Sequence, residues 1–300
     1  MTLPNREVAN TRTLFKAQSA MEYLMTYGWA ILIIGIALAA LFELGVFNSA
    51  NYAPRAQPGS CSVSKASYPV SLQGICTNQI PQYVPYFSNS WVKIPITNNY
   101  EFGTSKSFTI SFWEKTTDAS SSNYKFIFFF NRNPAWIDVL YDNSPGANSP
   151  SFELDSSGYF YGYYPSLSLN QWYNFVLVVD RQSGQAKMYL NGKLNSTAVT
   201  SISALGSLNT SGSVYLGCDG GTDCFTGQIS NFQIYDSALS ENGISALYAE
   251  GIGGVPIDVT HIVGWWPLNG NTNDYSGNGN GGIAHNVQYT SSWTSGYSQP

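Results

Sequence analysis

The first pattern that stands out in the chain is a long apolar run near its N-terminus. Charged residues are absent between Glu22 and Glu43, and every position from 28 to 41 is apolar. A helix of about 20 residues rises about 30 Å, which is the thickness of the hydrocarbon core of a bilayer. Because the run is apolar on all sides, it predicts a helix that lies in a membrane or inside a helical bundle.

From about residue 83 onward the hydrophobic period is two, which is typical of β-strands. Apolar and polar positions alternate in residues 108–112, 137–141 and 159–163. Residues 126–130 and 175–179 are continuous apolar runs of strand length, which suits strands covered on both faces. Strand patterns that recur with turn residues between them predict an all-β sandwich.

Two local patterns add detail to this sandwich. The dipeptide Asn191-Gly192 suits a tight hairpin turn between two strands. One short helix is expected at residues 240–248, where Ser240 can cap the N-terminus and Gly251 can end the helix.

Composition narrows the classes of function. Charged residues make up 10% of the chain and aromatic residues 15%, with 13 Lys and Arg against 18 Asp and Glu and a net charge of -5. Disorder driven by charge needs few aromatic residues, so the chain is expected to fold. Nucleic-acid binding needs a cationic surface, which this balance excludes. Two histidines leave little for zinc or catalytic-triad chemistry.

Basic residues precede the apolar run. Arg6, Arg12 and Lys16 lie upstream of it, with Glu7 as the one acid. The positive-inside rule therefore keeps the N-terminus in the cytoplasm and places everything after Phe47 outside the membrane.

Residues 16–23, just before the apolar run, read Lys-Ala-Gln-Ser-Ala-Met-Glu-Tyr. They resemble the class III signal of archaeal type IV prepilins, in which a peptidase cuts on the cytoplasmic side and leaves the hydrophobic helix on the mature protein. The resemblance covers residues 16–47 and implies cleavage between Ala17 and Gln18. Residues 1–17 would then be a leader and residues 18–47 a transmembrane or filament-core helix. The implied partners are other pilin subunits, in a homo- or hetero-polymer, and the membrane.

Glu22 would be the fifth residue of the mature protein. A carboxylate at the edge of an apolar helix is costly unless it is paired. The pilin resemblance implies that its partner is the free amine of Gln18 on a neighbouring subunit, while the alternative is a carboxylate that stays among lipid headgroups. Gly35 and Ala39 form a small-xxx-small pair that would let two helices approach closely.

The four cysteines all follow the apolar run. Cys61 and Cys76 lie in residues 48–81, which are rich in proline and small polar residues and which we interpret as a linker with a disulfide loop. Four cysteines permit three pairings, and an outward-facing chain favours disulfides. We expect Cys61 to pair with Cys76 and Cys218 with Cys224, because each bond closes a short loop. Neither pair has the spacing of zinc ligands.

Four segments of the strand region, residues 107–113, 172–180, 188–193 and 227–236, follow a recognisable order. In this order they resemble laminin-G-like, concanavalin A-like jelly rolls, over about residues 83–251. The resemblance implies a mainly β fold, with a sandwich at residues 82–300 preceded by one long N-terminal helix.

Residues 263–282 look like the segment that normally opens such a module, although here they come last. A permuted arrangement is geometrically easy because domain termini often lie close together. We therefore predict that residues 263–268 pair into the same sandwich, near residues 91–96.

Two oxygen-rich loops are candidate calcium sites. Residues 274–280 resemble the first half of an EF-hand loop, but the twelfth position is His285 rather than Glu. Jelly-roll family members often bind calcium on loops at one rim. The candidate ligands are Asp219, Asp223, Asp274, Ser276, Asn278 and Asn280. The alternative is that Asn, Asp and Gly simply form turns here.

Aromatic side chains could stack on sugar rings, as in lectins of this fold. The expected exposed group is Tyr159, Tyr161, Tyr163, Tyr164 and Trp265, whereas Trp113, Trp172 and Trp266 are expected in the core. Asn195 and Asn209 begin sequons for N-glycans.

A catalytic site is not predicted. Glycanases need two carboxylates that flank the scissile bond, and Glu153-Leu-Asp155 is not followed by a third acid. His261 and His285 lie in turn-like contexts without a Gly-x-Ser-x-Gly nucleophile.

Taken together, the patterns predict a cell-surface type IV pilin-like subunit that displays a laminin-G-like head for adhesion or recognition. The alternative is a monomeric membrane-anchored module that binds glycans or proteins and does not assemble into a filament.

Overall fold

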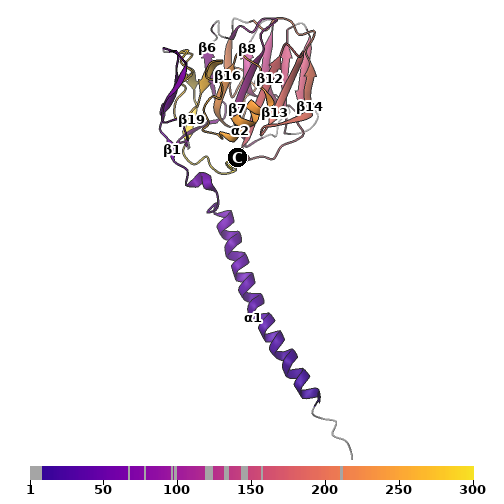
Figure 1. Cartoon of the computed structure of the whole chain (residues 1–300). Helices are drawn as coiled ribbons and strands as arrows, with labels where there is room; N and C mark the ends of the chain where they lie inside the picture. Colours follow the sequence, from indigo (N-terminus) through magenta and orange to yellow (C-terminus); the bar gives the residue numbers. More distant parts are fainter. Residues whose placement is uncertain are drawn as a thin grey trace, which may run out of the picture. The chain divides into compact units, whose positions relative to one another are not determined.

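The computed structural model describes residues 9–66, 68–77, 79–95, 97, 100–118, 124–131, 135–142, 148–156, 158–209 and 212–300. Its described side chains begin at Tyr23 and exclude those of Leu24 and Asn131. The chain divides into two compact units, Met1–Asn51 and Tyr52–Pro300. Figure 1 shows the helical unit and the β-rich unit, which we call the head.

The first unit consists of α1 (Ala9–Glu43) and the short 3-10 helix η1 (Ser49–Asn51). Residues Met25–Glu43 have a mean hydropathy of 2.1 and are long and apolar enough to cross a membrane, and none of this span is buried within the chain. The predicted apolar helix is therefore confirmed. Gly35 and Ala39 are exposed on it, while the side chains of Ala17, Gln18 and Glu22 lie outside the described ones.

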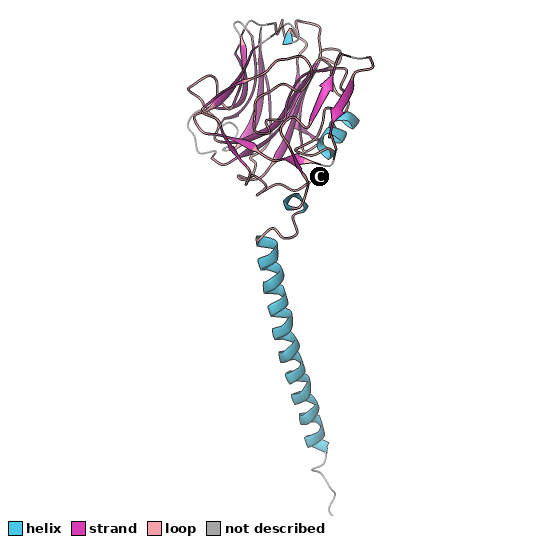
Figure 2. Cartoon of the chain, turned by 90° about the vertical axis from the view of Figure 1, so that its left-hand side faces the viewer, coloured by secondary structure: helices cyan, strands magenta, loops and turns pink. Residues whose placement is uncertain are grey.

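The head is a sandwich of two large antiparallel sheets (Figure 2). Sheet I runs through β11 (Tyr159–Tyr163), β10 (Ser149–Asp155), β9 (Trp136–Asp142), β8 (Lys125–Asn131), β15 (Ser213–Leu216), β6 (Trp91–Pro95) and β18 (Ile283–His285). Sheet II runs through β14 (Lys193–Ser201), β13 (Gln185–Leu190), β12 (Tyr173–Asp180), β7 (Phe108–Thr116), β16 (Gly227–Tyr235), β5 (Val84–Phe87) and β19 (Gln288–Thr290), with β17 (Ile262–Trp266) also paired to β16. The predicted mainly β sandwich is confirmed.

The main core lies between the two sheets. Along β7, Phe108, Ile110 and Phe112 are fully buried in it, and the intervening residues face the opposite way. The ring of Phe112 meets that of Phe128, from sheet I, edge to face at 5.6 Å. The period-two pattern thus supplies one wall of the core from each sheet.

The face of sheet II that points away from the core is covered. Helix α2 (Glu241–Ala249) places Ile244 and Leu247 against Val176 and Val178 of β12. Ser240 caps this helix, since its hydroxyl accepts a hydrogen bond from the Gly243 N–H at 3.2 Å. The predicted helix and its cap are confirmed.

The C-terminal segment covers another part of the same face. Trp293 is fully buried and packs edge to face on Trp172, with ring centroids 5.9 Å apart. The Lys115 ammonium donates to the main-chain carbonyls of Trp293 and Ser295, at 3.1 and 3.0 Å. Its pKa is lowered to about 8 by desolvation. The end of the chain is therefore bound to the sandwich rather than loose on its surface.

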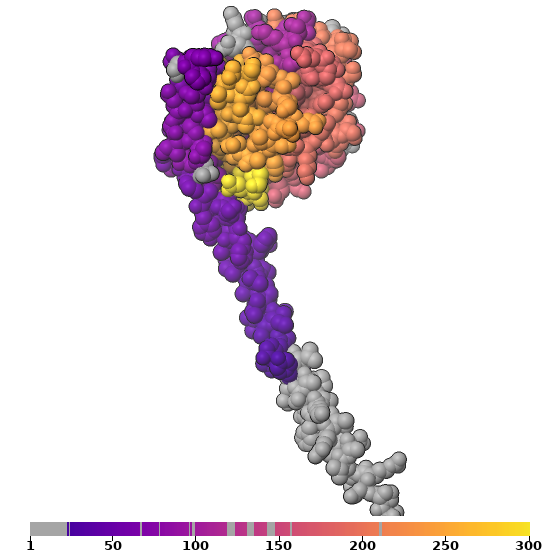
Figure 3. Space-filling view, in the orientation of Figure 1, coloured from indigo at the N-terminus to yellow at the C-terminus, as the bar shows by residue number. Residues whose placement is uncertain are grey.

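The segment expected to be a linker belongs largely to the head. Its short strands are β1 (Arg55–Ala56), β2 (Cys61–Ser64), β3 (Ser71–Gly74) and β4 (Ile80–Pro81), with β1 parallel to β4 and β2 antiparallel to β3. Val63 packs in a cluster with Tyr235, Ile262 and Trp265. Figure 3 shows this purple segment against the orange surface of later residues. The segment packs on the head instead of forming a free linker because these apolar side chains are buried there, and the prolines nearby do not prevent this burial.

The predicted place of residues 263–268 is half right. β17 does join the sandwich, but it pairs with β16 of sheet II and not with β6. Trp266 of β17, for example, lies opposite Phe232 of β16. Instead β18 pairs with β6 in sheet I. β16 pairs with β5 at Gly227 and Gln228, and its register against β7 shifts between Ser230 and Gln233. From Phe232 to Tyr235, β16 pairs with β17.

Candidate functional site

The outer face of sheet I carries one row of aligned side chains that crosses all seven strands. Direct cross-strand partners define it. This cross-sheet row consists of Tyr161, Glu153, Asp138, Phe129, Tyr215, Lys93 and Ile283. Strands lie about 4.8 Å apart, so the row extends roughly 29 Å. The coverings described above, α2, the β2–β3 hairpin and Trp293, all pack on sheet II or on β17.

Alternation along the strands fixes which way the row points. Phe152 and Leu154 of β10 lie in the core, so Glu153 between them faces outward. The same holds for Asp138, which lies between the core residues Ile137 and Val139. The two carboxyl groups therefore lie side by side on neighbouring strands, on the side of the sheet away from the core, with Asp138 buried and Glu153 half-buried.

The carboxyl pair is electrostatically strained. Asp138 is 1% exposed, and burial together with the Glu153 charge raises its pKa well above the ordinary value. Burial also raises the pKa of Glu153, against a hydrogen bond from Tyr159 that lowers it, and the charges of Asp142 and Asp155 raise it further. The pair thus retains a proton more readily than two separate carboxylates would.

Aromatic rings flank the pair. Tyr159 and Tyr161 are 53% and 55% exposed, with ring centroids 5.5 Å apart. Phe129 lies directly opposite Asp138 on the other side, and the Lys93 ammonium lies 5.9 Å from the Tyr215 ring centroid. The row combines hydrogen-bond acceptors with aromatic faces that remain open to solvent.

Comparison with known families assigns this sandwich to one of them. Residues 88–245, more than half of the chain, match the family described as the concanavalin A-like lectin/glucanases superfamily. The chain belongs to this superfamily. The match covers strands of both sheets and includes β8 to β11 of sheet I. No curated protein sequence matches the chain.

Several solved structures are similar to this chain at low sequence identity. A proposed carbohydrate binding protein from Bacteroides ovatus is 16% identical with a TM-score of 0.56, covering 76% of this chain and 64% of its own. The botulinum neurotoxin serotype D binding domain is 19% identical with a TM-score of 0.47, covering 57% of this chain and 42% of its own. The same ligand binding domain in complex with N-acetylneuraminic acid is 20% identical with a TM-score of 0.48, covering 65% and 47%. The chain thus spans less than two thirds of the length of these structures.

Two of the aromatic residues expected at the surface of this concanavalin A-like domain are buried. Tyr164 is 5% exposed, because its hydroxyl donates to the carbonyls of Met188 and Lys193 at 3.0 and 2.7 Å. Trp265 is 2% exposed, and its indole N–H donates to the Asn231 side chain at 2.8 Å. Tyr163 is half-buried, so only Tyr159 and Tyr161 of the expected group stand out from the surface.

Trp265 instead lines a cleft that opens to solvent. The Cys61–Cys76 disulfide forms part of its wall, together with Asn231 and Asn269. Both amides are engaged within the protein, since Asn231 donates to the Gly254 carbonyl at 2.8 Å and Asn269 donates to the Ala56 carbonyl at 2.8 Å. The cleft therefore presents few free hydrogen-bonding groups.

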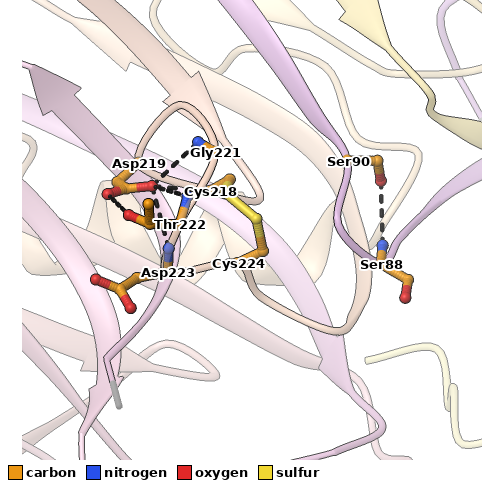
Figure 4. The surroundings of a disulfide bond; sticks show 8 residues. All are labelled: Ser88, Ser90, Cys218, Asp219, Gly221, Thr222, Asp223 and Cys224. Atoms are coloured by element: carbon orange, nitrogen blue, oxygen red, sulfur yellow. Dashed lines mark hydrogen bonds between the residues drawn. A yellow bond between two sulfur atoms is a disulfide. The ribbon is translucent and has the colours of Figure 1, made fainter.

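The second disulfide closes one candidate calcium loop. Cys218 is bonded to Cys224, as expected from the short loop. In Figure 4 the Asp219 carboxylate turns toward the N–H groups of its own loop, which donate from Gly221, Thr222 and Asp223. Although partial burial raises the pKa of Asp219, these hydrogen bonds and that of the Thr222 hydroxyl lower it below the ordinary value. Asp219 thus serves as an acceptor for its own loop.

The Asp274 loop has the same construction. Asp274 accepts from the N–H groups of Trp265, Ser276 and Asn280, at 3.1, 2.8 and 2.8 Å. The side-chain amides of Asn278 and Asn280 donate to the Val263 carbonyl. Calcium needs six to eight oxygen ligands, and within the part of the chain that the structure describes no three acidic, His or Cys side chains gather at one point. The loops as folded do not present a ready calcium shell, and calcium binding stays a prediction.

The sequons differ in setting. Asn209 is exposed, and its side-chain carbonyl accepts from the Gly103 N–H at 2.6 Å. Asn195 is half-buried within β14 rather than in a loop, and its side chain accepts from the Thr197 N–H at 3.1 Å. Glycosylation at either position stays a prediction.

Sequence patterns missed most of the cross-sheet row. Asp138, Phe129, Tyr215 and Lys93 were not candidates, because their alignment depends on pairing between strands far apart in the chain. One signal was available: Asp138 is a charged residue at an outward position of the alternating segment 137–141.

Proposed function

We propose that this chain is a cell-surface, pilin-like subunit whose concanavalin A-like head recognises glycans. The cross-sheet row is the observation that carries the recognition part. Sugar rings present apolar C–H faces and hydroxyl donors, which match exposed tyrosine rings and carboxylate acceptors on one surface. The length of the row, roughly 29 Å, suits an extended oligosaccharide rather than a single sugar.

Glycan binding is expected to depend on the exposed tyrosines. Tyr161→Ala and Tyr159→Ala should each weaken binding about five- to tenfold, because each removes a stacking surface without disturbing the core. The measurement is binding of the purified full-length protein, in detergent, to a printed array of neutral, amino and anionic oligosaccharides, followed by titration of the best ligand. Tyr52→Ala, at a 70% exposed tyrosine outside this face, is the matched control and should bind like the wild type. Equal binding by all three variants would contradict the proposal.

The anchoring part of the proposal rests on α1. Its Met25–Glu43 span is apolar and unburied within the chain, so it needs lipid or other helices around it. The basic residues before it and the two disulfides in the head favour an extracellular head. Residues 16–23, with their resemblance to prepilin signals, favour assembly into a filament over a solitary anchor.

Cleavage and assembly can be tested together. We expect the N-terminal sequence of the mature protein to begin at Gln18. We also expect Glu22→Ala to abolish filaments while leaving the protein in the membrane, because the Gln18 amine of a neighbouring subunit would lose its carboxylate partner. Electron microscopy of cells with an antibody to the head measures the filaments, and Glu43→Ala at the other end of the apolar run is the matched control. An uncleaved chain, or filaments that persist in Glu22→Ala, would leave the monomeric anchor as the better account.

A further inference from the structure

We propose that Asp138 and Glu153 form a subsite for the ammonium group of an amino sugar. The inference deepens the proposed glycan-binding function and rests on it. It names the class of saccharide that the cross-sheet row prefers.

The surroundings of the pair are acidic. Residues 136–163 contain four acids, Asp138, Asp142, Glu153 and Asp155, and no lysine or arginine. Asp142 and Asp155 lie close enough to Glu153 to act on its titration. Tyr159 of β11 forms a hydrogen bond with Glu153, and burial raises the pKa of its hydroxyl, so it is neutral in ordinary conditions. A negatively charged sugar would be repelled here, and a positively charged group would be attracted.

Asp138 supplies the more specific sign of a missing partner. The residue is 1% exposed, its carboxyl group has a hydrogen bond to the Glu153 backbone, and one of its oxygens, Oδ1, has no hydrogen-bond donor. A buried polar atom without a partner is costly, and in native proteins such atoms are commonly satisfied by a ligand or water. Because Glu153 lies directly opposite on β10, a donor placed between the two strands would meet both carboxyl groups.

The form of the site favours an ammonium group over a metal ion. Calcium takes six to eight oxygen ligands, whereas this pair offers two carboxyl groups and the Tyr159 hydroxyl. An ammonium group needs three acceptors and gains from aromatic rings beside it. Tyr161 lies next to Glu153 across the strand pair, and Phe129 lies next to Asp138.

The same rings favour a sugar over a lysine side chain. Tyr159 and Tyr161 form an exposed double surface, with centroids 5.5 Å apart, beside the carboxyl pair. A sugar ring that carries an amine can stack on this surface while its ammonium group reaches Glu153. A lysine side chain has no ring and therefore cannot stack on this surface.

The test compares two oligosaccharides that differ only at the amine. Isothermal titration calorimetry of the full-length protein in detergent, at neutral pH, would use a hexamer of glucosamine and a hexamer of N-acetylglucosamine. We expect the wild type to prefer the free amine by about tenfold. Glu153→Gln should remove most of this preference, because it weakens binding of the glucosamine hexamer more than binding of the acetylated hexamer. Asp138→Asn should act in the same direction. Glu250→Gln, which removes an equal charge from an exposed position at the end of α2, should keep the full preference.

Four results would overturn the inference. The first is a wild type that binds both hexamers with equal affinity, together with a Tyr161→Ala variant that binds neither. This result would overturn the ammonium subsite and leave glycan recognition intact. The second is a preference for the glucosamine hexamer that survives in Glu153→Gln, which would assign the attraction to the net negative charge of the protein. Tighter, Glu153-dependent binding of an oligolysine peptide would replace the saccharide with a protein ligand. No binding of either hexamer would also reject the subsite, and the oligosaccharide array would then decide the proposed function separately.

Discussion

Glu114→Gln is expected to make the head more stable than the wild type at neutral pH, by about 3 kcal/mol at pH 7. Glu114 lies on β7, points between the sheets and has no exposed surface. The Tyr141 hydroxyl donates to one of its oxygens at 2.7 Å, and the other oxygen, Oε2, has no partner. Desolvation raises the pKa of this carboxyl from 4.5 to about 8, although the hydrogen bond from Tyr141 acts to lower it.

The direction of the effect follows from where the proton is held. Below pH 4.5 Glu114 is protonated in the folded and the unfolded chain, so its contribution to stability is fully present. Between pH 4.5 and 8 the unfolded chain loses the proton while the folded head keeps it, and the free energy of unfolding falls by about 1.4 kcal/mol per pH unit. Glutamine does not titrate, so the variant escapes this loss. Its amide also keeps an acceptor for Tyr141.

Urea unfolding of the full-length protein in detergent, followed by tryptophan fluorescence, measures the effect. The stability difference between Glu114→Gln and the wild type should grow from pH 5 to pH 8. Glu250→Gln, at an exposed position, should show no such growth. A Glu114→Gln curve that runs parallel to the wild type across this range would contradict the assignment of a buried, protonated Glu114.

Trp293→Ala is expected to destabilise the head by about 3–5 kcal/mol, the usual cost of truncating a buried aromatic residue. The Trp293 ring is fully buried, lies 5.4 Å from the Arg55 guanidinium and donates its N–H to the Pro81 carbonyl at 3.0 Å. Removing the ring leaves a cavity beside Trp172 and takes one of two donors from the Pro81 carbonyl, which also accepts from the Arg55 guanidinium at 3.3 Å.

The control for this prediction lies in the same chain. Trp29→Ala removes a tryptophan that is 62% exposed on α1, so unfolding of the head should be unchanged. Trp293→Phe keeps an aromatic ring and loses the hydrogen bond to Pro81, so its cost should be smaller than that of Trp293→Ala. Denaturant unfolding in detergent compares all three, and wild-type stability in Trp293→Ala would show that the C-terminal segment does not hold the sandwich together.

Much of the fold follows from local patterns in the sequence. The period-two segments became β7, β9 and β11, and the two continuous apolar runs became β8 and β12. The Asn191-Gly192 turn joins β13 to β14 with both residues at positive φ. These features depend on neighbours within a few residues. The pairing of β17 with β16, in contrast, joins segments about thirty residues apart in the chain, which no local pattern predicts.

The candidate site was harder to predict for the same reason. Tyr159 and Tyr161 could be chosen because their own strand alternates, but Trp265 was placed at the surface when the β2–β3 hairpin covers it. Along its own strand Glu153 is followed by one acid, Asp155, and this local pattern predicts no site. Its partner, Asp138, lies on the next strand, and only the register of β9 against β10 brings the two together.

The last strands of the chain complete the first strands of the head. β18 pairs with β6, β19 pairs with β5, and Trp293 reaches back to Pro81. Because the ribosome makes the chain from the N-terminus, β5 and β6 must wait for roughly 200 residues before their edge partners exist. Contacts so distant in sequence are slow to form, and until then the open strand edges can join other chains. The head is therefore expected to reach its native state only after synthesis is complete, and a chaperone that holds the growing chain would raise its yield.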